Sequence, residues 1–174
     1  GGAIFVGYGS SATIKNSVFD GNDGSVANDG FSAGAISTYG GGERAKVVNS
    51  NGSRNVGGGA FLNISDTTFT NNKGKYGAVY TLLTGLSVYS KDKIIIENSK
   101  IVNNKARKGG GLAVQSYRDK ANPASLIIRD SIIANNTSTS QGGGLWTDVK
   151  GGVTIEDSTF SSNRITNSQK NGIG

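Results

Sequence analysis

The sequence predicts an all-β chain wound as a right-handed parallel β-helix, a solenoid of about six coils. Three observations predict it. A nine-residue motif recurs six times, a glycine followed by a small or aliphatic residue precedes each copy, and no segment has the length and periodicity of an amphipathic helix. We expect residues 1–174 to form a single β-helix domain that belongs to a longer chain or assembly.

The composition agrees with a narrow solenoid core and limits the chemistry. The chain is 34% hydrophobic and has 28 glycines and one proline. It has no cysteine and no histidine, which excludes disulfides, thiolate metal sites and every Ser-His or Cys-His nucleophile. The net charge is +6, and the one small basic cluster, Lys105, Arg107 and Lys108, is interpreted as a solvated loop. No nucleic-acid partner and no membrane span are expected.

The recurring motif reads apolar-x-Asn/Asp-Ser/Thr-x-apolar-x-x-Asn. β-Branched residues and turn residues dominate it, so each copy is expected to form two short strands that meet at the Asn/Asp-Ser/Thr bend. Spacings of 33, 17, 32, 32 and 27 residues between the bends predict loops of variable length on fixed corners. The copies span residues 14–22, 47–55, 64–72, 96–104, 128–136 and 155–163.

Equivalent residues of successive coils should stack about 4.8 Å apart and form inward ladders. The motif's first apolar position gives Ile14, Val47, Ile64, Ile96, Ile128 and Ile155. Its second gives Phe19, Phe69, Ile101, Ile133 and Phe160, with a gap at Gly52. A third inward ladder is expected directly after the opening glycines, at Ala3, Ala35, Ala60, Ala78, Leu112 and Leu145. By alternation, the next residues should face outward: Ile4, Ile36, Phe61, Val79, Ala113 and Trp146.

The last position of the motif is asparagine in all six copies. An amide both donates and accepts, so stacked amides can bond to the coils above and below. Asparagine also tolerates the left-handed backbone of a tight corner. We therefore favour a structural ladder over a ligand-binding row, formed by Asn22, Asn55, Asn72, Asn104, Asn136 and Asn163.

A second polar column follows the bends, at Asn16, Asn49, Asp66, Asn98, Asp130 and Asp157. Asp130 and Asp157 should be adjacent, and two neighbouring carboxylates can attract a cation. Calcium is the minority interpretation, because one carboxylate pair provides too few of its six to eight oxygen ligands. No other metal or cofactor is expected.

The opening and closing motifs resemble those of the polymorphic outer membrane protein repeat family. Residues 1–4, 33–36 and 58–61 are similar to its GGAI motif, and residues 19–22, 69–72 and 160–163 to its FxxN motif. The resemblance spans essentially the whole chain. It implies a pectate-lyase-like β-helix that is secreted or displayed at the cell surface as an adhesive passenger.

The segments 82–92, 116–124 and 149–152 leave the same corner of successive coils and should lie side by side. Their aromatic and charged side chains, with a tryptophan on the neighbouring strand, can stack on sugar rings and bind hydroxyls. The alternative is an apolar stripe that loops or another part of a longer chain cover. The candidate ligand-binding residues are Tyr89, Tyr117, Arg118, Asp119, Trp146 and Asp148.

These observations favour a non-enzymatic extracellular β-helix, used as an adhesin, stalk or fibre segment. Its expected partners are glycans, a host or cell surface, and a second copy joined end to end. The alternative is a polysaccharide lyase or glycoside hydrolase, in which Asp119, Asp148 and Glu97 act as acid/base groups and Arg118 as the base of a lyase. Ice binding is a remote third hypothesis, because the outward columns are irregular.

Overall fold

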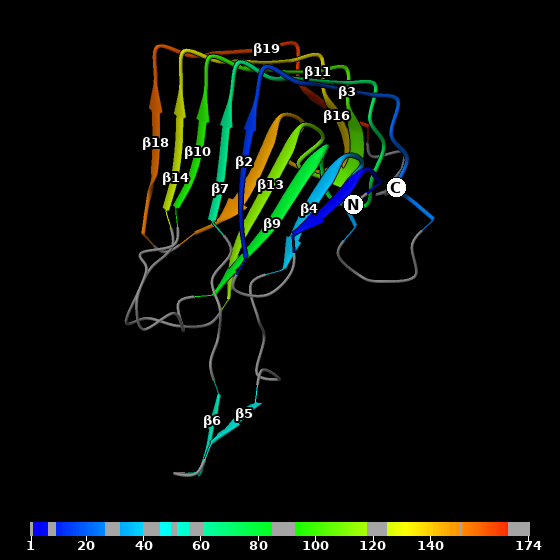
Figure 1. Cartoon of the computed structure of the whole chain (residues 1–174). Helices are drawn as coiled ribbons and strands as arrows, with labels where there is room; N and C mark the ends of the chain where they lie inside the picture. The colour runs from blue at the N-terminus through cyan, green and yellow to red at the C-terminus, as the bar shows by residue number, and fades with distance from the viewer. Residues whose placement is uncertain are drawn as a thin grey trace, which may run out of the picture.

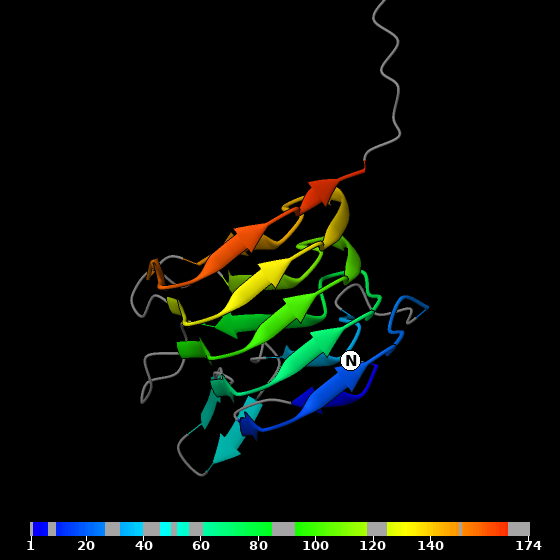
Figure 2. The same cartoon turned by 90° about the horizontal axis from the view of Figure 1, so that it is seen from above.

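The computed structural model describes residues 2–6, 10–26, 32–39, 46–49, 52–55, 61–84, 93–117, 125–149 and 151–166. The chain winds as a parallel β-helix. Seen from the N-terminal end it turns clockwise as it recedes, which makes the helix right-handed (Figure 1). Successive coils stack from the N-terminal to the C-terminal end (Figure 2). The prediction of an all-β parallel solenoid is confirmed.

Four parallel sheets form the walls, and each strand pairs with its equivalent in the next coil. Sheet A contains β1 (Ile4–Val6), β4 (Ile36–Tyr39), β9 (Val79–Thr84), β13 (Leu112–Tyr117) and β17 (Leu145–Asp148). Sheet B contains β2 (Ser11–Lys15), β7 (Phe61–Ser65), β10 (Lys93–Glu97), β14 (Ser125–Arg129) and β18 (Val153–Glu156). Sheet C contains β3 (Val18–Asp20), β8 (Thr68–Thr70), β11 (Lys100–Val102), β15 (Ile132–Ala134) and β19 (Thr159–Ser161). Sheet D contains β12 (Lys105–Lys108), β16 (Thr137–Gln141) and β20 (Arg164–Ile165).

The second copy of the motif does not form a coil, so the described residues make five stacked levels and not six. Its residues form β5 (Lys46–Asn49) and β6 (Gly52–Asn55), which pair with each other in antiparallel fashion. Strand β2 pairs directly with β7. The 17 residues that separate this copy from the next are too few for a circuit. Val47, Asn49 and Asn55 therefore lie outside the predicted columns.

The two ladders that start from the motif's apolar positions are confirmed. Ile14, Ile64, Ile96, Ile128 and Ile155 lie in register on sheet B, and Phe19, Phe69, Ile101, Ile133 and Phe160 on sheet C. The rings of Phe19 and Phe69 stack with centroids 4.9 Å apart and planes 7° apart. A further inward column on sheet B was not predicted, and its buried members are Leu62, Ile94 and Leu126.

The prediction for sheet A was wrong by one residue over part of its length. Ile36, Val79 and Leu112 share one register and are fully buried, so Ile36 and Val79 face inward. Ile4 and Leu145 occupy the same column. Hydrogen bonds connect Ala35 to Ala78, Ala78 to Gly111 and Gly111 to Gly144, so these glycines take the position of the alanines. The predicted third ladder therefore combined members of two columns: Ala35 and Ala78 belong to one, and Leu112 and Leu145 to the other. An error of one residue in a strand assigns a side chain to the opposite face. Ala60 lies outside the described residues, and only the backbone of Phe61 is described, in β7.

The asparagine ladder is confirmed for five of its six predicted members. In each step, the backbone N–H and the Nδ2 of one asparagine donate to the Oδ1 of the next, over 2.9–3.1 Å. Asn72, Asn104 and Asn136 are almost completely buried. Their Nδ2 atoms also donate to the carbonyls of Phe19, Phe69 and Ile101, one coil earlier. The ladder runs through Asn22, Asn72, Asn104, Asn136 and Asn163, and Asn55 in β6 is not a member.

The left-handed backbone belongs to the residue before each ladder asparagine and not to the ladder asparagine itself. This column, with φ between 53° and 66°, is Gly21, Asn71, Asn103, Asn135 and Ser162. The motif's bend is left-handed as well. Its column, with φ between 44° and 51°, is Asn16, Asp66, Asn98, Asp130 and Asp157. Asparagine and aspartate tolerate this conformation better than most other residues, which explains the polar bend position.

Two further contacts explain recurring residues of the motifs. A Cβ on Gly111 would lie 2.9 Å from Nδ2 of Asn136, and one on Gly144 would lie 2.8 Å from Cγ of Asn163. These opening glycines therefore make room for the amide ladder. The hydroxyls after the bend form a second ladder, in which the N–H groups of Thr67, Ser99 and Ser131 donate to the hydroxyl oxygens of Ser99, Ser131 and Ser158.

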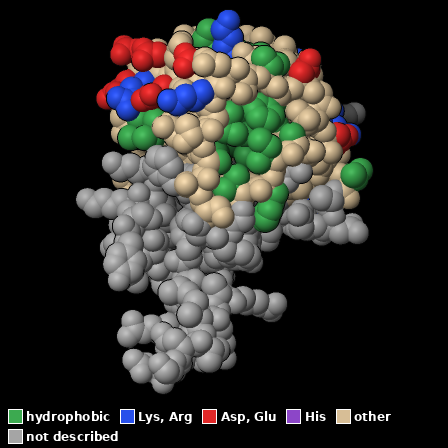
Figure 3. All heavy atoms as spheres, in the orientation of Figure 1, with side chains coloured by type: hydrophobic (Ala, Val, Ile, Leu, Met, Phe, Trp, Pro, Cys, Tyr) green, Lys and Arg blue, Asp and Glu red, His purple; other side chains and the backbone are tan. Residues whose placement is uncertain are grey.

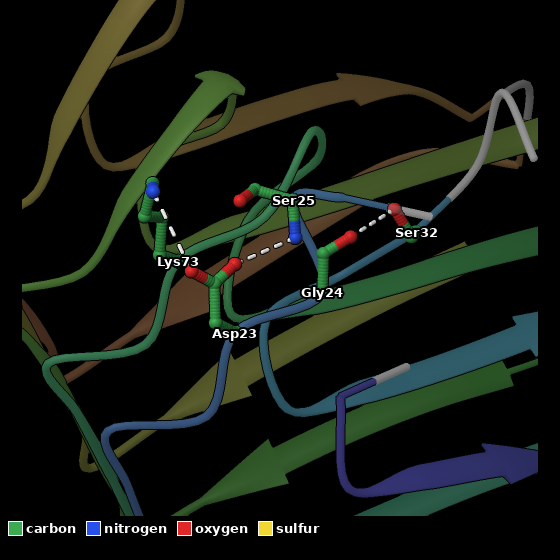
Figure 4. A network of polar contacts seen from close by, with 5 residues as sticks. All are labelled: Asp23, Gly24, Ser25, Ser32 and Lys73. Atoms are coloured by element: carbon green, nitrogen blue, oxygen red, sulfur yellow. Dashed lines mark hydrogen bonds and ion pairs between the residues drawn. The ribbon is translucent and has the colours of Figure 1, made fainter. Parts of the chain in front are cut away.

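The first coil closes the N-terminal end incompletely. Hydrophobic side chains gather at the centre of this end, and charged ones lie along its upper rim (Figure 3). A polar network ties the first coil to the second (Figure 4). The Asp23 carboxylate accepts from the backbone N–H of Ser25 at 2.8 Å and from Nζ of Lys73 at 3.4 Å, and the hydroxyl of Ser32 donates to the carbonyl of Gly24. Hydrogen bonding by Ser25, and then the charge of Lys73, hold the pKa of Asp23 below its ordinary value of 3.8.

Candidate functional site

The outer face of sheet A holds the predicted tryptophan. Trp146 in β17 lies beside Ala113 in β13, and both alternate with inward residues. Ala113 is completely buried together with Ala33, and Trp146 packs against this pair, separate from the main core. The outward direction of Trp146 is thus confirmed, but its indole is half-buried and not freely exposed. Because alanine is small, the neighbouring coil leaves room for the indole to lie against the sheet.

Lys108 in β12 and Tyr76 from the preceding coil hold the indole in place. The ring of Tyr76 lies 6.2 Å from that of Trp146, at an angle of 47°. Nζ of Lys108 lies 4.5 Å from the centroid of the indole, which is a cation–π contact. Tyr76 and Lys108 are neighbours in adjacent coils through a β-bridge. The indole is therefore fixed between strands and not carried on a mobile loop.

Polar side chains continue this face along the strands. Asp148 follows Trp146 by two residues in β17, and Gln115 lies beside it in β13. Since alternate strand residues share a face, both lie on the outer side of sheet A with the indole. We call Tyr76, Lys108, Gln115, Trp146 and Asp148 the tryptophan platform. It joins an apolar ring to a carboxylate, an amide and an ammonium group, which is the combination that can pack on a sugar and bond its hydroxyls.

The structure tests only some of the predicted ligand-binding residues. Trp146 and Asp148 lie on one face of β17, so Asp148 belongs to the strand and not to the segment after it. Tyr117 ends β13, where its backbone lies beside that of Thr84, and nothing further is described for it. Tyr89, Arg118 and Asp119 lie outside the described residues.

No protein-family model, no curated protein and no solved structure matches the chain. The architecture therefore rests on the geometry of the stacked sheets, which is that of a parallel β-helix.

The carboxylates that the enzymatic alternative would use are not gathered on one sheet. Asp148 lies on the outer face of sheet A, whereas Glu97 lies on sheet B. Glu97 also forms an ion pair with Arg129, with Oε1 2.8 Å from Nη2. The described residues thus do not place Glu97 in the tryptophan platform.

The corner between sheets B and C carries the carboxylates that were considered for calcium. Asp130 and Asp157 lie on adjacent coils, as predicted, and both are exposed. Asp66 in the same column accepts a hydrogen bond from the amide of Asn98. Among the described residues, no group of three or more Asp or Glu side chains lies together in a way that could hold a metal ion.

The sequence interpretation missed Tyr76, Lys108 and Gln115. Lys105, Arg107 and Lys108 were interpreted as a solvated loop, but they belong to β12 of sheet D. The glycines after these strands could have indicated that the segment is a strand that ends at a corner. Gly109 and Gly142 both have a positive φ, and they lie where the chain passes from sheet D to sheet A.

Across the described ranges, no helix is long and apolar enough to cross a membrane.

Proposed function

We propose that the chain is a non-enzymatic β-helical scaffold, secreted or displayed at a cell surface, that binds glycans through the tryptophan platform. One observation carries the proposal: an indole that a cation and a tyrosine ring hold on rigid strands, with a carboxylate two residues further along the same strand. A preorganised aromatic surface of this kind loses little conformational entropy when it binds a ligand.

The sequence motifs support the proposed location. The GGAI and FxxN patterns resemble those of polymorphic outer membrane protein repeats, which implies secretion or surface display as an adhesive passenger. In this chain the asparagine of FxxN forms the amide ladder, and the glycines make room for it. The rigid stack that results is suited to an adhesin, stalk or fibre segment, because its side faces remain available along the whole rod.

Intrinsic fluorescence provides a direct test, since Trp146 is the one tryptophan of the chain. A glycan array with the purified chain identifies ligands, and each is then titrated while the emission of Trp146 is followed. We expect a saturable change in emission. Titration calorimetry, which does not need the indole, compares the variants: Trp146→Phe, which keeps a smaller aromatic ring, and Asp148→Asn, which removes the charge, should each weaken binding by about fivefold or more.

Phe5→Ala is the matched control, because Phe5 is an exposed aromatic residue on the same sheet in the first coil. It should bind the same glycans with unchanged affinity. Array binding that persists in Trp146→Ala and Asp148→Asn would place glycan recognition elsewhere. Depolymerisation of an acidic polysaccharide by the wild-type chain would favour the enzymatic alternative.

A further inference from the structure

Charge is segregated around the rod. Seven of the nine Lys and Arg side chains that the structure describes belong to sheets C and D and their connections, in coils two to five. Of the eight described carboxylates, only Asp20 in β3 and Asp23, which bridges to Lys73, lie on sheet C or beside sheet D, and both are in the first coil. Asp66, Asp130 and Asp157 lie at the bend between sheets B and C. The seven cations are Lys73, Lys75, Lys100, Lys105, Arg107, Lys108 and Arg164.

One column of sheet D concentrates this charge. Lys73, Lys105, Thr137 and Arg164 occupy equivalent positions in four successive coils. Lys73 is partly neutralised by Asp23, at 3.4 Å. Lys105 and Arg164 are both exposed, and no carboxylate is described on sheets C and D at their levels. At a strand spacing of about 4.8 Å, their backbones lie about 10 Å apart along the axis.

A depression lies between these two cations. Thr137 has a short side chain, and the long side chains of Lys105 and Arg164 flank it one coil away on either side. The depression has a volume of about 500 Å³, and its lining includes Asn103, Lys105, Asn135, Thr137, Arg164 and Thr166. Asn103 and Asn135 are the left-handed corner residues, and their side chains are exposed. Two positive groups thus face a hollow that amides and hydroxyls also border.

We propose that this depression binds the anionic groups of a linear acidic polysaccharide that runs along the rod. Lys105 and Arg164 would pair with sulfate or carboxylate groups, and the amides and Thr137 would bond to ring hydroxyls. The spacing of the cations is fixed by the coil repeat, so a chain with regularly repeated charges can meet Lys73, Lys105 and Arg164 in sequence. This site is on sheet D, and its existence does not depend on the tryptophan platform of sheet A.

The lining favours a polysaccharide over a nucleic acid. Among the described residues that line it, none has an aromatic side chain on which a base could stack. Its amides and hydroxyls both donate and accept, as sugar hydroxyls require, whereas a phosphate backbone needs donors alone.

Titration calorimetry of the folded chain tests the proposal with four probes of matched length: a heparin oligosaccharide for sulfate, an oligogalacturonate for carboxylate, a dextran oligomer as the neutral glycan, and double-stranded DNA. Measurements at about 50 mM and about 200 mM NaCl give the salt dependence. We expect at least one of the two acidic saccharides to bind and dextran not to bind. Whichever acidic saccharide binds identifies the preferred anionic group.

Three variants locate the site. Lys105→Ala and Arg164→Ala should each raise the Kd by about threefold to tenfold and lower the salt slope by about one. Thr137→Tyr fills the depression without a change of charge, so it should raise the Kd by about threefold or more and leave the salt slope unchanged. Lys15→Ala is the matched control, because Lys15 is an exposed cation on sheet B. Arg164→Lys should retain most of the affinity, and melting curves confirm that each variant is folded.

The proposal is overturned if neither acidic saccharide binds, or if Lys105→Ala and Arg164→Ala bind as Lys15→Ala does. An unchanged Kd in Thr137→Tyr would show that the cations act as a flat charged surface and that the depression is not the binding site. DNA that binds more tightly than both saccharides, with the same dependence on Lys105 and Arg164, would exclude a polysaccharide as the ligand.

Discussion

Asn104 shows what the fold requires of a single side chain. Its Oδ1 accepts from the backbone N–H and Nδ2 of Asn72, and its Nδ2 donates to the carbonyl of Phe69 and to Oδ1 of Asn136. The residue is 1% exposed, so water cannot replace these partners. The cost of losing the amide is therefore set by the polar groups that remain buried on both neighbouring coils.

We expect Asn104→Ala to lower the free energy of unfolding by about 2–4 kcal/mol, because it removes the acceptor that two buried donors of Asn72 share. Urea unfolding followed by circular dichroism measures this loss. Asn103→Gly is the control: it removes an exposed amide from the preceding residue, whose φ of 58° suits glycine. Equal stabilities of the two variants would contradict the structural role of the ladder.

The lowered pKa of Asp23 should make the stability of the fold depend on pH in the acid range. Its pKa in the folded chain lies below 3.8, so its carboxylate stabilises the fold above pH 3.8, and this contribution is lost as the pH falls through the folded pKa. A carbon NMR titration of the side chain should show a midpoint below 3.8. Lys73→Ala should raise this midpoint only slightly, since the hydrogen bonds from the hydroxyl and then the backbone N–H of Ser25 are the larger causes. If the midpoint rises more in Lys73→Ala than in Ser25→Ala, the charge of Lys73 and not the hydrogen bonding of Ser25 is the main cause of the lowered pKa.

At the level of elements, the β5–β6 hairpin is an insertion between two strands that stack without it. Tyr39 and Asp148 occupy equivalent register positions at the ends of β4 and β17, and Leu62 and Val153 are equivalent in β7 and β18. Two residues of each coil can thus be compared directly. From Tyr39 to Leu62 the chain uses 40–61, whereas from Asp148 to Val153 it uses only 149–152.

Replacing residues 40–60 by the sequence of 149–151 should therefore keep the coil stack intact. A shorter connection costs less closure entropy, so the free energy of unfolding should stay unchanged or rise by up to about 2 kcal/mol. Thermal unfolding followed by circular dichroism tests this. A variant that no longer unfolds in one cooperative transition would show that the hairpin contributes to the stack.

The sequence could predict some elements of the fold and not others. The ladder asparagine of each coil, such as Asn104, and the bend, such as Asp130, were assigned correctly, because few residue types suit a buried amide or a tight bend. The left-handed conformation expected at the ladder asparagine lies one residue earlier. The second copy matches the motif in sequence. The nine residues of the motif, however, do not show whether the chain after them completes a coil. The prediction for sheet A failed for a different reason: alanine and glycine both fit the small column, so the sequence did not show that the opening glycine Gly111 takes the position of Ala35 and Ala78.

At the level of the molecule, burial depends on having a coil on each side. Ile96 lies between β7 and β14 and is fully buried, whereas Ile155 in the fifth coil is 45% exposed. We expect Ile96→Ala to cost about 2–5 kcal/mol of stability and Ile155→Ala less than about 2 kcal/mol. Denaturant unfolding of both variants checks the difference. Equal losses would contradict the assignment of neighbours along the stack.

The candidate sites also depend on the whole stack. Trp146 and Asp148 could be predicted to share a face because they alternate on one strand. Tyr76 and Lys108 could not, because they reach the indole from another sheet and other coils. Likewise, Lys105 and Arg164 are 59 positions apart in the sequence, and only the register of sheet D makes them flank one depression.

The amide ladder gives every coil the same two chemical ends: an acceptor for the asparagine before it and donors for the one after it. The steps from Asn72 to Asn104 and from Asn104 to Asn136 each take 32 residues. Tandem duplication of such a segment would insert one more coil with the same asparagine contacts on both sides, and it would lengthen the β-helix by about 4.8 Å. The length of such a β-helix can therefore change during evolution by whole coils, and no new contacts between coils are needed.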